Sequence, residues 1–217
     1  ATVPIERVDD EGLGAELNNI AAINSLRVYR ALRYGRNDKL IITDQHSYRM
    51  EGQTGRPEVT PIDPPDFPSM FPEEAAAIID DGRAYNNGNP PETIKVGQAE
   101  IANFRKEEPP YTLFGSKQRA WLKQRLTSSP ATWKIWGASG GTLDWRFDPQ
   151  NIPEGLTKPW PGTGFAGSGG GDFSSAFIEG AEIYDAVRDA GVTGFVTVSG
   201  DRHSFWAGYA AKALPPA

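Results

Sequence analysis

The sequence TGFVTVSGDRHSFW, residues 193–206, joins a buried-strand pattern directly to a dense polar cluster. Residues 195–198 are aromatic or β-branched, and only Thr197 among them is polar. This pattern is typical of a strand buried on both faces of a sheet. Residues 199–203 follow without any apolar side chain. Ligands of open α/β sheets bind just beyond the carboxyl ends of strands. The stretch therefore predicts a functional site at the end of a strand, where Gly200 allows a sharp turn.

Asp201 and His203 have a spacing that suits a metal site. Alternate residues of an extended segment point to the same side, so both side chains could reach one ion. Carboxylate and imidazole together suit zinc, iron or manganese, whereas carboxylates alone suit calcium. The alternative is a turn in which Asp201 caps a backbone amide and His203 lies on the surface. The spacing alone leaves both interpretations open.

The composition excludes several classes of protein. The chain has 217 residues, enough for a single domain, and its formal net charge is -6 without a Lys- or Arg-rich run. Nucleic-acid binding by charge is therefore not expected. The absence of cysteine excludes disulfides and thiolate metal ligands within the chain. No apolar run is long enough to span a membrane, and the first residues do not resemble a signal peptide.

The hydrophobic pattern predicts an α/β fold with a mixed sheet flanked by helices. Residues 27–34 and 39–43 are expected to form a β-hairpin. We expect one domain over residues 1–217, in which 51–97 and 142–172 are dominated by long loops. The other expected elements are helices at 11–23, 73–79, 97–107, 117–128 (capped by Ser116) and 174–190, and strands at 132–136 and 195–198.

Three polar clusters follow expected strands, at residues 44–49, 137–144 and 199–203. If these strands are parallel neighbours, the clusters meet on one edge of the sheet. Both histidines of the chain, His46 and His203, lie in these clusters. The sequence thus predicts an active site at this edge.

Two features of the clusters allow alternatives. The glycine turn at 139–141 either presents backbone amides to an anion or is a plain turn. Arg49 either holds a phosphate group or forms an ion pair with Asp44 or another neighbour. Neither a G-x-S-x-G motif nor a phosphate-binding P-loop motif is present, which disfavours serine hydrolases and P-loop enzymes.

Several short motifs occur in a characteristic order along the chain. They are Tyr29-Arg30-x-Leu32-x-Tyr34-Gly35, Leu40-Ile41-Ile42-Thr43-Asp44-x-x-Ser47-Tyr48-Arg49, Gly115-x-x-Gln118-x-x-Trp121-Leu122-x-x-x-Leu126, Ser128-x-x-Ala131-x-Trp133-Lys134-Ile135-x-Gly137 and Val198-Ser199-Gly200-Asp201-x-His203-Ser204. In this order the chain resembles the PhoD-like alkaline phosphatase family of the calcineurin-like metallophosphoesterases, over about residues 26–206.

The resemblance implies part of a two-sheet α/β/β/α metallophosphoesterase sandwich. It implies hydrolysis of phosphate mono- or diesters by metal-activated water, with calcium and iron, or zinc or manganese, as the metal ions. It also implies a periplasmic or cell-surface location. The Gly-Asp-x-His motif of the family falls on residues 200–203, so Asp201 and His203 are expected to be catalytic and, with Asp44, to bind metal.

The chain also departs from the family pattern. The first half of the family's domain, with its early metal ligands, is not found here, so the chain resembles a C-terminal portion. A complementary chain carrying that half is an expected partner. His46 stands where the family usually has Arg, and together with Arg49 it is expected to bind the phosphate ester.

Two other functions are compatible with the sequence. The first is a metal- or ligand-binding fragment without independent catalysis, because a two-metal site needs more ligands than Asp201, His203 and Asp44 supply. The second is an acyl hydrolase that uses Ser199 or Ser204 with His203, although the chain has no nucleophile elbow.

Overall fold

A computed structural model describes the chain at residues 3–10, 14–25, 28–63, 66–67, 70–143, 145–169, 171–201, 203 and 205–210. It divides into two compact units, each made of separate segments. The first unit consists of Ala1–Met50, Thr112–Thr142 and Glu179–Lys212, and the second of Glu51–Tyr111, Leu143–Ile178 and Ala213–Ala217. The single domain expected over residues 1–217 stays a prediction, and each unit is described by itself.

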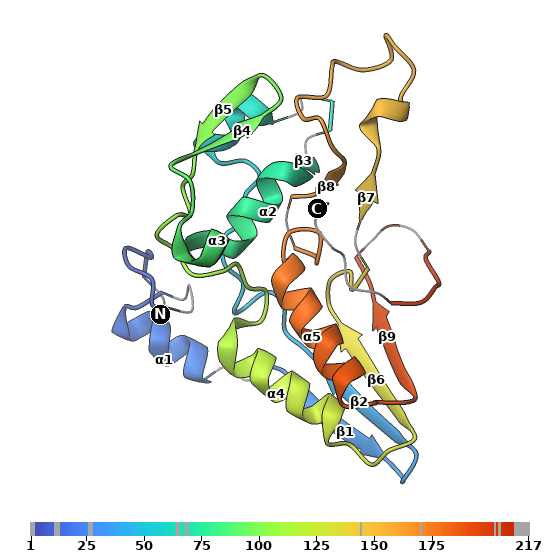
Figure 1. The fold of residues 1–217 in the computed structure, drawn as a ribbon. Coiled ribbons are helices and arrows are strands. Elements are labelled where there is room, and N and C mark those ends of the chain that lie inside the picture. Colours follow the sequence, from blue (N-terminus) through green and yellow to red (C-terminus); the bar gives the residue numbers. More distant parts are fainter. Residues whose placement is uncertain are drawn as a thin grey trace. The chain divides into compact units, whose positions relative to one another are not determined.

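A four-stranded mixed sheet with the order β1-β2-β6-β9 forms the centre of the first unit (Figure 1). β1 (Arg30–Tyr34) and β2 (Asp38–Ile42) form the predicted antiparallel hairpin. β6 (Trp133–Ala138) is parallel to β2, and β9 (Phe195–Ser199) is parallel to β6. The mixed α/β fold that the sequence predicted is therefore confirmed.

The helices of the first unit are α1 (Leu17–Ser25), α4 (Gly115–Thr127) and most of α5 (Phe177–Asp189). α4 and α5 run alongside one face of the sheet (Figure 1). On this face the fully buried Trp136 of β6 lies against rings from both helical regions and from β9. Its contacts are with Phe114, Tyr184 and Phe195.

The opposite face of β9 is not buried, which corrects the expected burial of residues 195–198 on both faces. Val196 is 38% exposed and Val198 is 50% exposed. Because strand residues alternate between faces, Phe195 packs toward Trp136 while Val196 and Val198 point the other way. β9 also lies at the end of the strand order, so the apolar run belongs to an edge strand.

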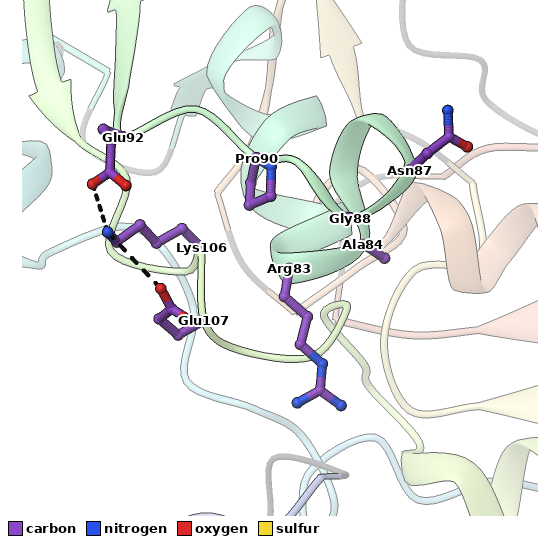
Figure 2. Close-up of a pocket in the computed structure, with 8 residues that line it drawn as sticks. All are labelled: Arg83, Ala84, Asn87, Gly88, Pro90, Glu92, Lys106 and Glu107. Carbon is purple, nitrogen blue, oxygen red and sulfur yellow. Dashed lines mark hydrogen bonds and ion pairs between the residues drawn. The ribbon is translucent and has the colours of Figure 1, made fainter.

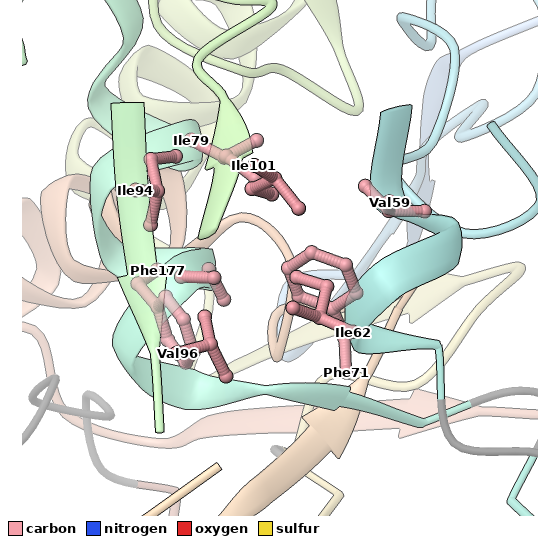
Figure 3. Close-up of a cluster of buried hydrophobic side chains, with 10 residues drawn as sticks. Val59, Ile62, Phe71, Ile79, Ile94, Val96, Ile101 and Phe177 are labelled. Atoms are coloured by element: carbon pink, nitrogen blue, oxygen red, sulfur yellow. The ribbon is translucent and has the colours of Figure 1, made fainter. Parts of the chain in front are cut away.

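The second unit surrounds a separate hydrophobic core (Figure 3). Its members are Val59, Ile62, Phe71, Ala75, Ala76, Ile79, Ile94, Val96, Ile101 and Phe177. The elements of this unit are the 3-10 helices η1 (Pro57–Ile62), η2 (Gly82–Ala84) and η3 (Pro149–Asn151), the helices α2 (Glu73–Asp81) and α3 (Tyr85–Gly88), and the strands β3 (Met70–Pro72), β4 (Thr93–Val96), β5 (Ala99–Ala102), β7 (Arg146–Phe147) and β8 (Ala166–Ser168). The regions expected as loops thus contain short elements and core residues.

The prediction of a helix at residues 97–107 is wrong, because β5 lies within this range and pairs with β4 as an antiparallel hairpin. Gly97 at its turn has φ +57, and a Cβ at this position would lie 2.2 Å from the carbonyl oxygen of Pro161. The buried residues Ile94 and Val96 alternate with exposed ones, which is the period of a strand. Within the described part of the chain, no helix has the length and apolar character needed to cross a membrane.

Candidate active site

The carboxyl ends of β2, β6 and β9 lie next to one another in the first unit. Ile42 is paired with Gly137, and Gly137 with Val198, so the three parallel strands end at one edge. A hollow of about 380 Å³ lies there. It is lined by Ile42, Thr43, Gly137, Ala138, Ser139, Val198 and Ser199. The prediction that these strand ends meet at one edge is confirmed.

Asp44 follows β2 at this edge, and hydrogen bonds to its backbone groups hold it there. The side chain of Gln118, in α4, accepts a hydrogen bond from Asp44 N at 2.7 Å and donates one to Asp44 O at 2.8 Å. Asp44 Oδ1 accepts hydrogen bonds from the amides of His46 and Ser47, both at 2.9 Å. These bonds fix the orientation of the carboxylate.

The second oxygen of Asp44, Oδ2, is buried and has no hydrogen-bond partner in the described structure. The residue as a whole is 7% exposed. Burial acts to raise the pKa of Asp44, but the hydrogen bonds from Ser47 and His46 outweigh burial and lower the pKa below its ordinary value. The edge therefore holds a carboxylate whose lowered pKa favours the ionised form and whose Oδ2 is buried without a partner in the described structure.

Gln45 holds the glycine turn that follows β6. Gln45 Oε1 accepts a hydrogen bond from Gly140 N at 2.7 Å and one from Ser139 Oγ at 3.3 Å. The Gly140 amide is thus used within the chain, which favours the plain turn over the anion site. Gln45 is 1% exposed, and its Nε2 has no partner among the described residues.

Asp201 and His203 lie beyond β9 in a conformation that differs from the expected extended one. Both are exposed, and both have positive φ, 69° for Asp201 and 52° for His203. Left-handed backbone at both positions removes the alternation on which their convergence was argued. Arg202 between them lies outside the described residues. Their expected roles in catalysis and metal binding stay predictions.

His46 and Arg49, the expected substrate-binding residues, are both exposed. Asp44 and Arg49, both of which the structure describes, form no ion pair with each other, so Arg49 is not occupied in that way. Ser199 lines the hollow, whereas Ser204 lies outside the described residues.

The expected metal ligands do not assemble into a complete site. The residues that the structure describes contain no group of three or more His, Cys, Asp or Glu side chains that could hold a metal ion. Asp44 Oδ2 is a suitable single ligand because it is a buried carboxylate oxygen without a partner. A two-metal centre would require further ligands beside it.

Sequence reasoning missed the residues that hold Asp44 in place. Gln118 is 1% exposed and lies at helical spacing with the fully buried Leu122 and Leu126. A polar amide on the apolar stripe of a helix was the available signal. Glu179, a fully buried carboxylate in the first turn of α5, gave the same kind of signal.

A larger hollow, of about 720 Å³, lies in the second unit (Figure 2). Its lysine, Lys106, is paired with Glu92 at 2.5 Å and with Glu107 at 3.9 Å. With Arg83, the lining carries two cations and two carboxylates, so its formal charges balance and it does not favour an anionic ligand. None of the expected site residues lines it. The edge of the four-stranded sheet is therefore the better candidate.

Comparison with known proteins identifies the family. The model of the PhoD-like phosphatase family matches residues 3–214. A solved structure described as "Structure of PhoD" is 17% identical with a TM-score of 0.49, and the similarity covers 82% of this chain and 24% of that chain. The present chain thus spans about a quarter of that protein's length. No curated protein matches the chain. Since the family match extends over nearly every residue, the chain belongs to the PhoD-like phosphatase family.

Proposed function

We propose that this chain takes part in the hydrolysis of phosphate mono- or diesters, with the carboxyl edge of β2, β6 and β9 as its share of the active site. Membership of the PhoD-like phosphatase family supports the reaction class. The observation that carries the location is Asp44, whose buried Oδ2 has no partner in the described structure and which directly follows Thr43, a residue that lines the hollow.

Metal dependence is part of the proposal. Metal ions at such a site neutralise phosphate charge and activate water for attack. Asp44 supplies one preformed ligand, and we infer that Asp201 and His203 supply others, with His46 and Arg49 binding the phosphate ester. Iron, zinc or manganese suits carboxylate and imidazole ligands, and calcium beside iron suits the carboxylates. The remaining ligands come from outside the described residues.

A complementary β-rich half supplies those ligands in this proposal. The face of the sheet opposite α4 and α5 supports it, because its residues are apolar and yet exposed. Leu32 and Val196 are each 38% exposed, Trp133 is 49% exposed and Val198 is 50% exposed. The strand register places all four on one face. A second sheet packed on this face would bury these four side chains.

We also propose a periplasmic or cell-surface location for the assembled protein.

The proposal is tested by hydrolysis of p-nitrophenyl phosphate and of its bis-ester, with metal content measured on the same samples. We expect metal-dependent turnover that chelation abolishes and that Asp44→Asn lowers at least about 100-fold, since removing a preorganised charged group commonly has such an effect. Asp63→Asn, at an exposed carboxylate of the second unit, is the matched control. Turnover that survives chelation, Asp44→Asn and His203→Ala would refute the proposal.

The second candidate is a metal- or ligand-binding fragment without catalysis of its own. It is favoured by the lack of a three-ligand group among the described residues. In that case the isolated chain binds metal ions in titration calorimetry, Asp44→Asn weakens binding, and no ester is hydrolysed even with added metal.

A further inference from the structure

Glu179 is a fully buried carboxylate in the first unit that the proposed chemistry does not use. It lies in the first turn of α5. One oxygen accepts a hydrogen bond from Thr112 Oγ1 at 2.5 Å, and the other accepts one from Leu113 N at 2.6 Å. The charged group that faces it is Arg119 of α4, whose Nη1 lies 3.5 Å from Glu179 Oε1.

Thr112 connects Glu179 to the start of α4 through its hydroxyl group. Its Oγ1 accepts hydrogen bonds from Phe114 N at 3.2 Å and from Gly115 N at 2.8 Å. Phe114, at the N-cap position, offers no side-chain cap, and Ser116 is already within the helix. Thr112 therefore performs the capping that the sequence assigned to Ser116, and Glu179 holds Thr112 in place.

Gln118 continues the connection from α4 to the candidate active site. Besides its two hydrogen bonds with the backbone of Asp44, its Nε2 donates to Phe114 O at 3.2 Å. One buried amide thus joins the first turn of α4 to both backbone groups of Asp44. The groups between the start of the helix and Asp44 are buried and hydrogen-bonded.

We propose that Glu179 and Gln118 are positioning residues for Asp44: Glu179 holds the start of α4 through Thr112 and Leu113, and Gln118 holds Asp44 from α4. This inference rests on the proposed function only in taking Asp44 as part of the active site. According to this inference, ionisation of Glu179 changes the orientation of the Asp44 carboxylate, although the two side chains are not in contact.

The electrostatic setting makes this connection responsive near neutral pH. Burial raises the pKa of Glu179 to about 7, against the hydrogen bonds from Thr112 and Leu113 and the charge of Arg119, which lower it. Arg119 is shared with Glu182 at 3.1 Å, and Lys123 also pairs with Glu182. Ionisation of Glu179 strengthens the hydrogen bond from Leu113 N, since charged acceptors form stronger bonds.

The test is a ¹H–¹⁵N NMR titration of the 217-residue chain from about pH 5 to pH 8.5, a window around the raised pKa. We expect the amide signals of Leu113 and Asp44 to shift with a common midpoint near 7. Glu179→Gln should abolish both shifts. Gln118→Met, of similar volume, should keep the shift of Leu113 and abolish that of Asp44.

Two controls separate this connection from local effects. His46→Gln removes an imidazole two residues from Asp44 and should leave the common midpoint unchanged. Asp189→Asn, at an exposed carboxylate on α5, should do the same. If Glu179→Gln does not fold, Thr112→Val cuts the same connection at the next residue and should abolish the shift of Asp44.

An Asp44 amide that does not titrate with Leu113 in the unmodified chain overturns the inference without any variant. So does a shift of Asp44 that persists in Glu179→Gln. The readout requires no hydrolysis, so a chain that shows the common midpoint but no phosphoesterase activity contradicts the proposed function alone. A chain that hydrolyses esters without the common midpoint contradicts the positioning role alone.

Discussion

Asp44 is a buried carboxylate that hydrogen bonds hold in one orientation. Four hydrogen bonds fix its backbone and one of its oxygens, and the other oxygen has no partner in the described structure. A buried acceptor without a partner costs about 1–3 kcal/mol, so such a group usually has a functional reason. The exposed pair Asp201 and His203 has no comparable support in the described structure.

Glu179 should make the stability of the chain depend on pH. Its pKa is raised from 4.5 to about 7, so the folded state keeps a proton that the unfolded state has already released between these values. The contribution to stability is complete below about pH 4.5 and is lost as the pH rises to about 7. The loss is up to about 3 kcal/mol.

Glu179→Gln removes this dependence. Urea denaturation at a series of pH values should show the unfolding free energy of the variant gaining on that of the unmodified chain by up to about 3 kcal/mol between pH 4.5 and pH 8. Parallel pH profiles for the two proteins would contradict the burial of an ionisable Glu179.

The two hairpins offer a comparison of turns at the level of secondary structure. Gly97, between β4 and β5, and Gly35, between β1 and β2, have φ of +57 and +60. Both therefore lie in the region that costs an L-residue about 1–2 kcal/mol. They differ in their surroundings, because a Cβ at Gly35 meets nothing within 4 Å whereas one at Gly97 meets Pro161 O at 2.2 Å.

Gly97→Ala should accordingly be the more harmful substitution. We expect Gly35→Ala to cost about 1 kcal/mol, from its backbone conformation alone. Gly97→Ala should cost about 2–4 kcal/mol, since the carbonyl of Pro161 must also move. Chemical denaturation of both variants measures the two changes in unfolding free energy. Equal changes would mean that residues 160–162 can move away from the added methyl group at little cost.

For the whole molecule, two substitutions compare the exposed face of the four-stranded sheet with its buried face. Val198→Lys should change the unfolding free energy by less than about 1 kcal/mol if the face is open to solvent, because Val198 is 50% exposed. Ile41→Ala, on the fully buried face, should cost about 2–5 kcal/mol. A cost for Val198→Lys as large as that for Ile41→Ala would show that the chain covers this face itself.

Local patterns in the sequence were sufficient for the mixed sheet, the first hairpin, α4, α5 and the common edge of the three strand ends. Each follows from hydrophobic periodicity within a few residues or from short links between elements. The same patterns failed at residues 97–107, where charged residues after Gly97 resemble a helix but β4 and β5 pair with each other. They also placed Asp201 and His203 on an extended segment, although both have positive φ.

The supports of the candidate site came only from the tertiary structure. Gln118 binds Asp44 across 74 residues of sequence, and Glu179 binds Thr112 across 67. Periodicity reports which face of one element is apolar, but it contains no information on which distant element covers that face. The role of a buried Gln or Glu depends on the partner that folding brings next to it. For Gln118 that partner is the backbone of Asp44.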